Sequence, residues 1–202
     1  MALHHKAFAL FSGFPDFRTG MKNCREEQIM VLPVELMKLL LLEKLYLDND
    51  KLAQLPPELG ELRSLKVLRV DNNLLLSGDI PTELWVPDWV NLDLSHNKLC
   101  GDASFLFCAD KPTNLINLSF NNFEFDMSMI KFSVSTWTLV VNNNMINGSI
   151  PAQINMLSNP VNFNMSYNRL CGIIPAGPVM DKFDGAHFYH NKCLCRSKDS
   201  CL

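Results

Sequence analysis

Apolar and polar residues alternate over short segments that recur along the chain at a nearly constant interval. Each segment fits the pattern L-x-x-L-x-L-x-x-N-x-L, and successive asparagine positions are 23 or 24 residues apart. Alternation with a period of two predicts a short strand with one buried face. Because so short a strand cannot bury its face alone, neighbouring segments must stack and share a core. The asparagine positions, which we call the column, are occupied by Asp50, Asn73, Asn97, Asn121, Asn144 and Asn168, and the inward apolar pairs are Leu45/Leu47, Leu68/Val70, Leu92/Leu94, Ile116/Leu118, Leu139/Val141 and Phe163/Met165. We expect the side-chain amide of a column asparagine to satisfy backbone groups where the chain turns out of the strand.

This period and this pattern are typical of leucine-rich repeats. The sequence therefore predicts an α/β leucine-rich-repeat solenoid, a curved right-handed superhelix with a parallel β-sheet on its concave face and irregular or short helical returns. Isoleucine–proline pairs at 80–81, 150–151 and 174–175 indicate where returns begin, because proline fixes φ and cannot donate to a strand ladder. A leucine-rich helical bundle is the alternative, but the 11 prolines recur along the chain, and helix interiors do not tolerate proline.

The repeat phase divides the chain into three parts. We expect a non-repeat N-terminal leader at 1–31, about six repeats at 32–170, and a cysteine-rich C-terminal cap at 171–202. In the second repeat the glycine at Gly78 arrives one residue late, which indicates either a one-residue loop insertion or a join between two repeat arrays of different ancestry. The returns within 101–113 and 122–137 lack the isoleucine–proline pair, so we expect them to be irregular.

Composition and motifs exclude several classes of function. The net charge is −3 and no lysine- or arginine-rich block occurs, so nucleic-acid binding is not expected. No apolar run approaches the roughly 18 residues of a transmembrane segment. The sequence has no G-x-S-x-G elbow, P-loop or H-E-x-x-H motif. We therefore predict a non-enzymatic monomer with no catalytic residue, no cofactor and no metal.

Four of the seven cysteines crowd into the last 32 residues, at Cys171, Cys193, Cys195 and Cys201. This clustering indicates disulfides and an oxidising compartment. His187 and His190 precede two of these cysteines and would supply zinc-ligand types, but the C-x-C spacing is tighter than usual in zinc sites, so disulfides are the favoured interpretation. A local bridge between Cys100 and Cys108 stays open, with Cys24 then left over.

Indications of the cellular compartment conflict. Three N-x-S sequons, at Asn117, Asn147 and Asn164, are predicted glycosylation sites and are compatible with secretion. The N-terminus lacks a clear signal peptide, since its apolar stretch from Ala7 to Phe11 is soon interrupted by Ser12 and Gly13. We expect a secreted, cell-wall protein, and the missing signal keeps a cytoplasmic location open.

Residues 76–202 resemble plant polygalacturonase-inhibiting proteins, a family of extracellular leucine-rich-repeat proteins. The resemblance is carried by LSGDIPTEL at 76–84, LDLSHNKLCGDASFLF at 92–107, FEFDMSMIKF at 123–132, NGSIPAQI at 147–154 and the cysteine-containing segment 163–195. It implies a defence protein of the plant cell wall that binds secreted fungal polygalacturonases through its concave face and blocks substrate access. The resemblance also implies disulfides that join Cys171 to Cys193 and Cys195 to Cys201.

The outward positions of successive strands form rows across the predicted sheet. These rows are polar, slightly acidic near the first three coils and aromatic near the later ones, a surface that suits a cationic protein patch with aromatic anchors. Solvated carboxylates such as Asp48 and Asp71 lack the apolar pocket that acid catalysis needs. The candidate partner-binding residues are Tyr46, Asp48, Arg69, Asp71, Asp93, Ser95, His96, Asn117, Ser119, Phe120, Asn142 and Tyr167.

Three functions are compatible with this surface. The favoured hypothesis is a polygalacturonase inhibitor or inhibitor-like defence protein that acts by steric occlusion of a secreted fungal polygalacturonase. The alternative is a receptor-like or intracellular leucine-rich-repeat scaffold that binds another protein or a peptide. A third hypothesis is ice binding through the regular Asn, Ser and Thr positions, against which the interrupting aromatic and charged residues count.

Overall fold

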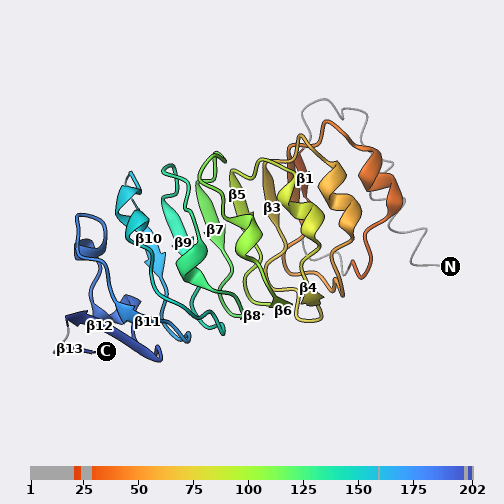
Figure 1. Cartoon of the computed structure of the whole chain (residues 1–202). Helices are drawn as coiled ribbons and strands as arrows, with labels where there is room; N and C mark the ends of the chain where they lie inside the picture. The colour runs from red at the N-terminus through yellow and green to blue at the C-terminus, as the bar shows by residue number, and fades with distance from the viewer. Residues whose placement is uncertain (1–20, 24–28, 159, 198–199, 202) are drawn as a thin grey trace.

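The computed structural model describes residues 21–23, 29–158, 160–197 and 200–201, and it confirms the predicted leucine-rich-repeat solenoid. Each coil contributes one short strand to a common sheet and returns through irregular chain or a short 3₁₀ helix (Figure 1). No helix within the described residues is long and apolar enough to cross a bilayer. The strands are β1 (Met21–Asn23), β2 (Lys44–Tyr46), β3 (Val67–Arg69), β4 (Ser77–Asp79), β5 (Asn91–Asp93), β6 (Lys98–Gly101), β7 (Leu115–Asn117), β8 (Asn122–Phe123), β9 (Thr138–Val140), β10 (Asn162–Asn164), β11 (Cys171–Ile173), β12 (Cys193–Ser197) and β13 (Ser200–Cys201). The 3₁₀ helices are η2 (Val34–Lys38), η3 (Pro57–Glu61), η4 (Thr82–Trp85), η5 (Ser104–Leu106), η6 (Met127–Met129), η7 (Ala152–Met156), η8 (Met180–Lys182) and η9 (Gly185–His187).

The main sheet is parallel and has the strand order β1-β2-β3-β5-β7-β9-β10. Its register keeps the predicted inward residues side by side: Leu92 lies between Leu68 and Ile116, and Ile116 pairs with Leu139. After each strand the chain turns outward, and a second parallel sheet, β4-β6-β8, forms along the flank of the solenoid. The returns within 101–113 and 122–137, which we expected to be irregular, each contain one short 3₁₀ helix, η5 and η6.

The sheet begins within the range that the repeat pattern assigned to the leader. Strand β1 pairs in parallel with β2, and Lys22 stands opposite Leu45. Ile29 is buried, and its backbone N–H donates to Asp50 Oδ1 at 3.1 Å. The sequence pattern did not extend this far because a lysine occupies the register position at which later coils have leucine. Residues 1–20 and 24–28, including Cys24, lie outside the described residues.

A ladder of buried asparagine side chains runs along the edge where each coil leaves the main sheet. In Asn121, Nδ2 donates to the carbonyl of Leu94 in the preceding coil at 2.9 Å and to that of Leu118 at 3.1 Å, while Oδ1 accepts from the Leu99 N–H at 3.0 Å. Asn144 and Asn168 repeat the pattern in their own coils. These amides satisfy backbone groups that would be costly to bury unpaired, which is the role predicted for the column.

The late glycine at Gly78 reflects an extra residue in the turn after Asn73. In the other five predicted repeats the second residue after the column is buried, whereas here the third, Leu76, takes that place and Leu74 and Leu75 are exposed. In a regular coil the column Oδ1 accepts from the N–H two positions after the preceding column residue, as Asn121 does from Leu99. Asn97 Oδ1 instead accepts from the backbone N–H of the preceding column residue itself, Asn73, at 2.9 Å. The extra residue is accommodated locally, because the strands on both sides keep their register.

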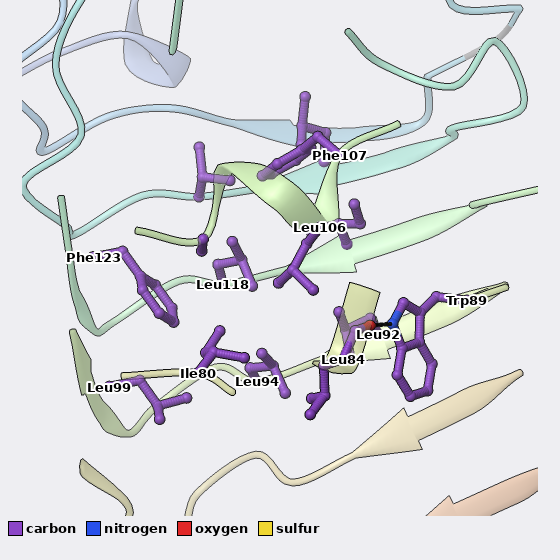
Figure 2. Packing of buried hydrophobic residues seen from close by; sticks show 14 of the residues in the cluster. Ile80, Leu84, Trp89, Leu92, Leu94, Leu99, Leu106, Phe107, Leu118 and Phe123 are labelled. Carbon is purple, nitrogen blue, oxygen red and sulfur yellow. Dashed lines mark hydrogen bonds between the residues drawn. The ribbon is translucent and has the colours of Figure 1, made fainter. Parts of the chain in front are cut away.

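One continuous hydrophobic core fills the space between the main sheet and the returns. Figure 2 shows part of it, where Leu92 from β5 and Leu94 just after that strand meet Leu84 from η4 and Leu106 from η5. Trp89 is buried at the same level, and its indole N–H donates to the Leu84 carbonyl at 2.6 Å. The indole thereby fills the return of the third coil and satisfies a carbonyl near the end of η4.

The C-terminal cap continues the repeat and is closed by a disulfide. Asn191, 23 residues after Asn168, donates to the Met165 and Phe188 carbonyls at 3.0 and 2.8 Å as a further member of the asparagine ladder. The predicted disulfide between Cys171 and Cys193 joins β11 to β12, where the two residues are direct register partners. The cap is therefore a seventh coil, fastened covalently to the sixth.

The remaining cysteines divide into bonded and free. Cys195 is disulfide-bonded and stands opposite Cys201 in the antiparallel pairing of β12 with β13. The Cys201 side chain lies outside the described part of the chain, so its bond to Cys195 stays a prediction. Cys100 and Cys108 are both free thiols, so the local bridge that the sequence left open does not form.

Candidate protein-binding surface

The outward-facing residues of the main sheet form three rows along the solenoid, which together we call the concave face. The first row is half-buried, the second is almost fully buried, and the third is exposed or half-buried. A partner would therefore contact mainly the first and third rows. In order along the chain, the first row is Tyr46, Arg69, Asp93, Asn117, Val140 and Asn164; the second is Asp48, Asp71, Ser95, Ser119, Asn142 and Ser166; the third is Asn49, Asn72, His96, Phe120, Asn143 and Tyr167.

Second-row residues support the first row more than they offer contact area. The Ser95 hydroxyl donates to Asp93 Oδ1 at 2.6 Å, and the Ser119 hydroxyl donates to Asn117 Oδ1 at 2.7 Å. Among the predicted contact residues, Asp48 and Asp71 are only 4% and 6% exposed. The sequence pattern identified these positions as outward-facing, but it did not reveal that the neighbouring rows cover them.

All third-row residues adopt the left-handed backbone conformation, with φ between 54° and 61°. Each stands immediately before a column residue, where the chain turns out of the sheet. Asparagine tolerates this conformation, whereas bulky side chains adopt it at a cost of about 1 kcal/mol. His96, Phe120 and Tyr167 occupy positions where Asn49 and Asn72 show that a less strained residue fits. Backbone strain of this kind clusters at functional positions, which makes these three rings the leading candidates for partner contact.

Two ring pairs extend this row along the solenoid. His96 and Phe120 stack at a centroid distance of 4.3 Å, and Tyr167 stacks on His190 at the same distance. His190 also has a positive φ of 57°, so it continues the third row into the seventh coil. From the sequence, His190 was assigned to the C-terminal cap and weighed as a possible zinc ligand. Its spacing of 23 residues from Tyr167, one repeat length, was the signal that could have placed it in the third row. Together the rings form an exposed ridge at one border of the concave face.

Charged residues gather at the N-terminal end of the concave face, in its first three coils. Arg69 Nη2 lies 3.2 Å from Asp71 Oδ1, with Asp48 and Asp93 on the adjacent strands. Burial raises the pKa of Asp71, and the Asp93 carboxylate adds to the rise, while Arg69 opposes it. Three carboxylates against one guanidinium leave this part of the first two rows acidic, in agreement with the predicted charge pattern.

The other border of the concave face, where the strands begin, carries an apolar pair that the sequence reading did not single out. Trp137 and Val161 immediately precede β9 and β10 and are 52% and 72% exposed. They are neighbours, because the Val161 N–H donates to the Trp137 carbonyl at 2.8 Å. Their position seven residues before the column was the signal available in the sequence. In the later coils, apolar side chains therefore flank both borders of a polar sheet.

The described ranges contain no cluster of three or more His, Cys, Asp and Glu side chains suited to a metal ion. The zinc alternative loses one ligand outright, since the Cys193 sulfur is bonded to Cys171. His187 Nδ1 lies 2.8 Å from Asp184 Oδ1, and His190 stacks on Tyr167, so the two imidazoles face different partners.

The repeat, the sheet and the asparagine ladder define the chain as a leucine-rich-repeat protein. No family model matches it. A segment of 109 residues is 49% identical to polygalacturonase inhibitor 2 of Arabidopsis thaliana, covering 54% of this chain and 33% of that protein. A segment of 108 residues is 39% identical to the polygalacturonase inhibitor of Pyrus communis, covering 54% and 32%. The resemblance to polygalacturonase inhibitors is thus confirmed over about half of the chain, which spans about a third of the length of these relatives.

Solved structures agree on the fold. A plant ice-binding protein matches with a TM-score of 0.78 at 34% sequence identity, covering 83% of this chain and 54% of that one. The leucine-rich-repeat ectodomain of the Arabidopsis receptor kinase HAESA matches with a TM-score of 0.70 at 24% identity, covering 85% and 29%. The second likeness shows the shared fold alone. Both likenesses support the leucine-rich-repeat solenoid fold.

Proposed function

We propose that this chain is a non-catalytic, protein-binding leucine-rich-repeat protein of the polygalacturonase-inhibitor type. It docks a secreted fungal polygalacturonase on its concave face and blocks access of the substrate by steric occlusion. The observation that carries this proposal is the 49% identity to a polygalacturonase inhibitor over 109 residues. The matched segment covers 33% of that relative, so inhibition by this chain is a proposal.

The concave face supports this role with two kinds of contact. Phe120 and Tyr167 are 45% and 51% exposed and project from strained backbone, as rigid aromatic anchors of an interface do. Asp93 is half-buried, with Oδ1 held by Ser95 and Oδ2 within 3.3 Å of Asn117 Nδ2. A preorganised carboxylate of this kind suits a lysine or arginine of the partner, because little side-chain entropy remains to be lost on binding.

An extracellular location, in the plant cell wall, belongs to the same proposal. The Cys171–Cys193 disulfide supports it, since disulfides persist in oxidising compartments. The named relatives are inhibitors of enzymes, which supports the assignment of a binding role without catalysis.

Inhibition of purified fungal polygalacturonases tests the proposal directly. Release of reducing ends from polygalacturonan would be measured with increasing amounts of the wild-type chain. We expect inhibition of at least one enzyme in a panel, weakened about tenfold or more by Asp93→Lys or Phe120→Asn. Met129→Ser, at a 78% exposed position in η6, is the matched control and should inhibit like the wild type. If the folded wild type neither binds nor inhibits any member of the panel, the proposal is rejected.

Ice binding is a second candidate, because the plant ice-binding protein is similar to this chain over 83% of its length. The regular Asn and Ser positions of the first two rows would face the ice lattice. The exposed rings of the third row interrupt that regularity, so we favour a protein partner. Thermal hysteresis of the purified chain separates the two: hysteresis without polygalacturonase binding would favour ice.

A further inference from the structure

Two of the three N-x-S sequons begin at the last residues of strands β7 and β10 of the main sheet, where both polar residues point to the concave face. In β7, Asn117 Oδ1 accepts from the backbone N–H and the hydroxyl of Ser119 at 3.2 and 2.7 Å. In β10, Asn164 Oδ1 accepts from the same groups of Ser166 at 3.0 and 2.7 Å. Ser119 and Ser166 are each 3% exposed. The serine hydroxyl of each sequon is therefore buried and already bonded.

The same hydrogen bonds form in β5 without an asparagine. Asp93 Oδ1 accepts from the backbone N–H and the hydroxyl of Ser95 at 3.1 and 2.6 Å. Asp93 occupies the first-row position of Asn117 and Asn164, and Asp93-Leu94-Ser95 is not a sequon. What the three triplets share is a side-chain oxygen that accepts from a serine two residues later. The fold thus explains the two strand sequons as a repeated sheet-face motif, independently of glycosylation.

The third sequon differs in each of these respects. Asn147 lies three residues beyond Asn144, in the turn that bridges to Asp126 on the flank of the solenoid. Its backbone N–H donates to the Phe125 carbonyl, while within the described residues its side-chain amide makes no hydrogen bond. Its serine, Ser149, is exposed, and the intervening Gly148 adopts a φ of +82°. An accessible turn with a free amide and a free hydroxyl is the setting in which surface glycans are carried.

We infer that Asn147 is the N-glycan acceptor of this chain, and that Asn117 and Asn164 stay unmodified as structural members of the concave face. The glycan then projects from the flank, in line with the second sheet, and the three rows stay bare for a partner. This inference rests on the proposed extracellular location, but its test does not involve a polygalacturonase, so the two can fail separately.

Site-resolved mass spectrometry tests the assignment on the full chain, directed into the secretory pathway of plant cells by an added signal peptide. We expect glycan on the peptide that contains Asn147 and none on those with Asn117 or Asn164. Asn147→Gln and Ser149→Ala should each remove the whole glycan mass, whereas Asn117→Gln and Asn164→Gln should leave it unchanged. Glycan on Asn117 or Asn164, or on no site at all, would overturn the inference.

The structural role of the strand sequons has its own matched pair of variants. Asn164→Asp keeps the acceptor oxygen, as Asp93 does, and should leave the melting temperature close to that of the wild type. Asn164→Leu removes the acceptor from the buried Ser166 hydroxyl and should melt several degrees lower. Equal destabilisation by the two variants would show that the shared acceptor oxygen is not what the motif preserves.

Discussion

The phenyl ring of Phe120 lies face to face with the imidazole of His96, with ring centroids 4.3 Å apart and planes inclined by 14°. Both residues have a left-handed backbone, one at the end of each of two neighbouring strands. The stack therefore depends on the coil-to-coil spacing of the solenoid, which brings equivalent positions together. Two strained positions thereby form one exposed ridge, so a replacement of Phe120 should alter both the backbone strain and the stack.

Phe120→Asn should change the free energy of unfolding by less than about 1 kcal/mol. Relief of the left-handed strain, about 1 kcal/mol, offsets the loss of a stacked pair worth about 0.5–1.5 kcal/mol. Phe120→Ala loses the stack without that relief, so it should be about 1 kcal/mol less stable than Phe120→Asn. Urea unfolding of the two variants measures the difference, and equal stabilities would contradict the strain argument.

Asn121→Ala should destabilise the chain by about 1–3 kcal/mol, because it leaves the buried Leu99 N–H without a partner. The Leu94 and Leu118 carbonyls lose one donor each but still accept from Asn97 and Asn144. Asn122→Ala is the matched control: Asn122 is the adjacent, exposed residue, and its replacement should cost no more than about 0.5 kcal/mol. Chemical denaturation measures the free energy of unfolding of both variants. Similar losses of stability would contradict a stabilising role for the asparagine ladder.

Removing the disulfide with Cys171→Ser and Cys193→Ser should lower stability by about 3 kcal/mol, as expected for a closed loop of this length. The bond spans a sequence separation of 22 and fastens the seventh coil. Hydrogen exchange should accelerate first at amides that bond to the seventh coil, such as that of Tyr167, whose N–H donates to the Tyr189 carbonyl at 2.8 Å, while those of the central strands stay protected. Cys100→Ser, at a free thiol, should have little effect. Uniform acceleration along the whole chain would argue against a local clamp.

Asp71→Asn should raise the free energy of unfolding at neutral pH. Because the pKa of Asp71 is raised in the fold, the folded state binds its proton more tightly, and the ionised carboxylate costs stability above that pKa. The advantage of the variant should shrink as the pH falls through the raised pKa towards the ordinary aspartate value of 3.8, since the wild-type carboxyl is then protonated. Thermal melts from pH 7 to pH 3 measure this trend. An advantage that grows on acidification would refute the assignment.

Much of the fold could be predicted from the sequence. Leu92, Ile116 and Leu139 are buried side by side as the repeat pattern required, and the asparagine column bonds as expected. Coils at the two ends were harder to recognise. Met21–Asn23 lack the leucine of the repeat, and Asn191 is preceded by Ala186 and Phe188 instead of a leucine pair. At such ends the neighbouring coil supplies the register, so the residues themselves need not carry the pattern.

The sequence by itself determined which side chains face the core and which face outward, because burial in a solenoid follows the short periods of strand and repeat. Only the tertiary structure decided which outward residues a partner can reach. Asp71 and Phe120 both point away from the core, yet Asp71 is 6% exposed and Phe120 is 45% exposed. That difference arises from backbone dihedrals and from contacts between residues some 24 positions apart, and neither is encoded in the residue types of a single repeat.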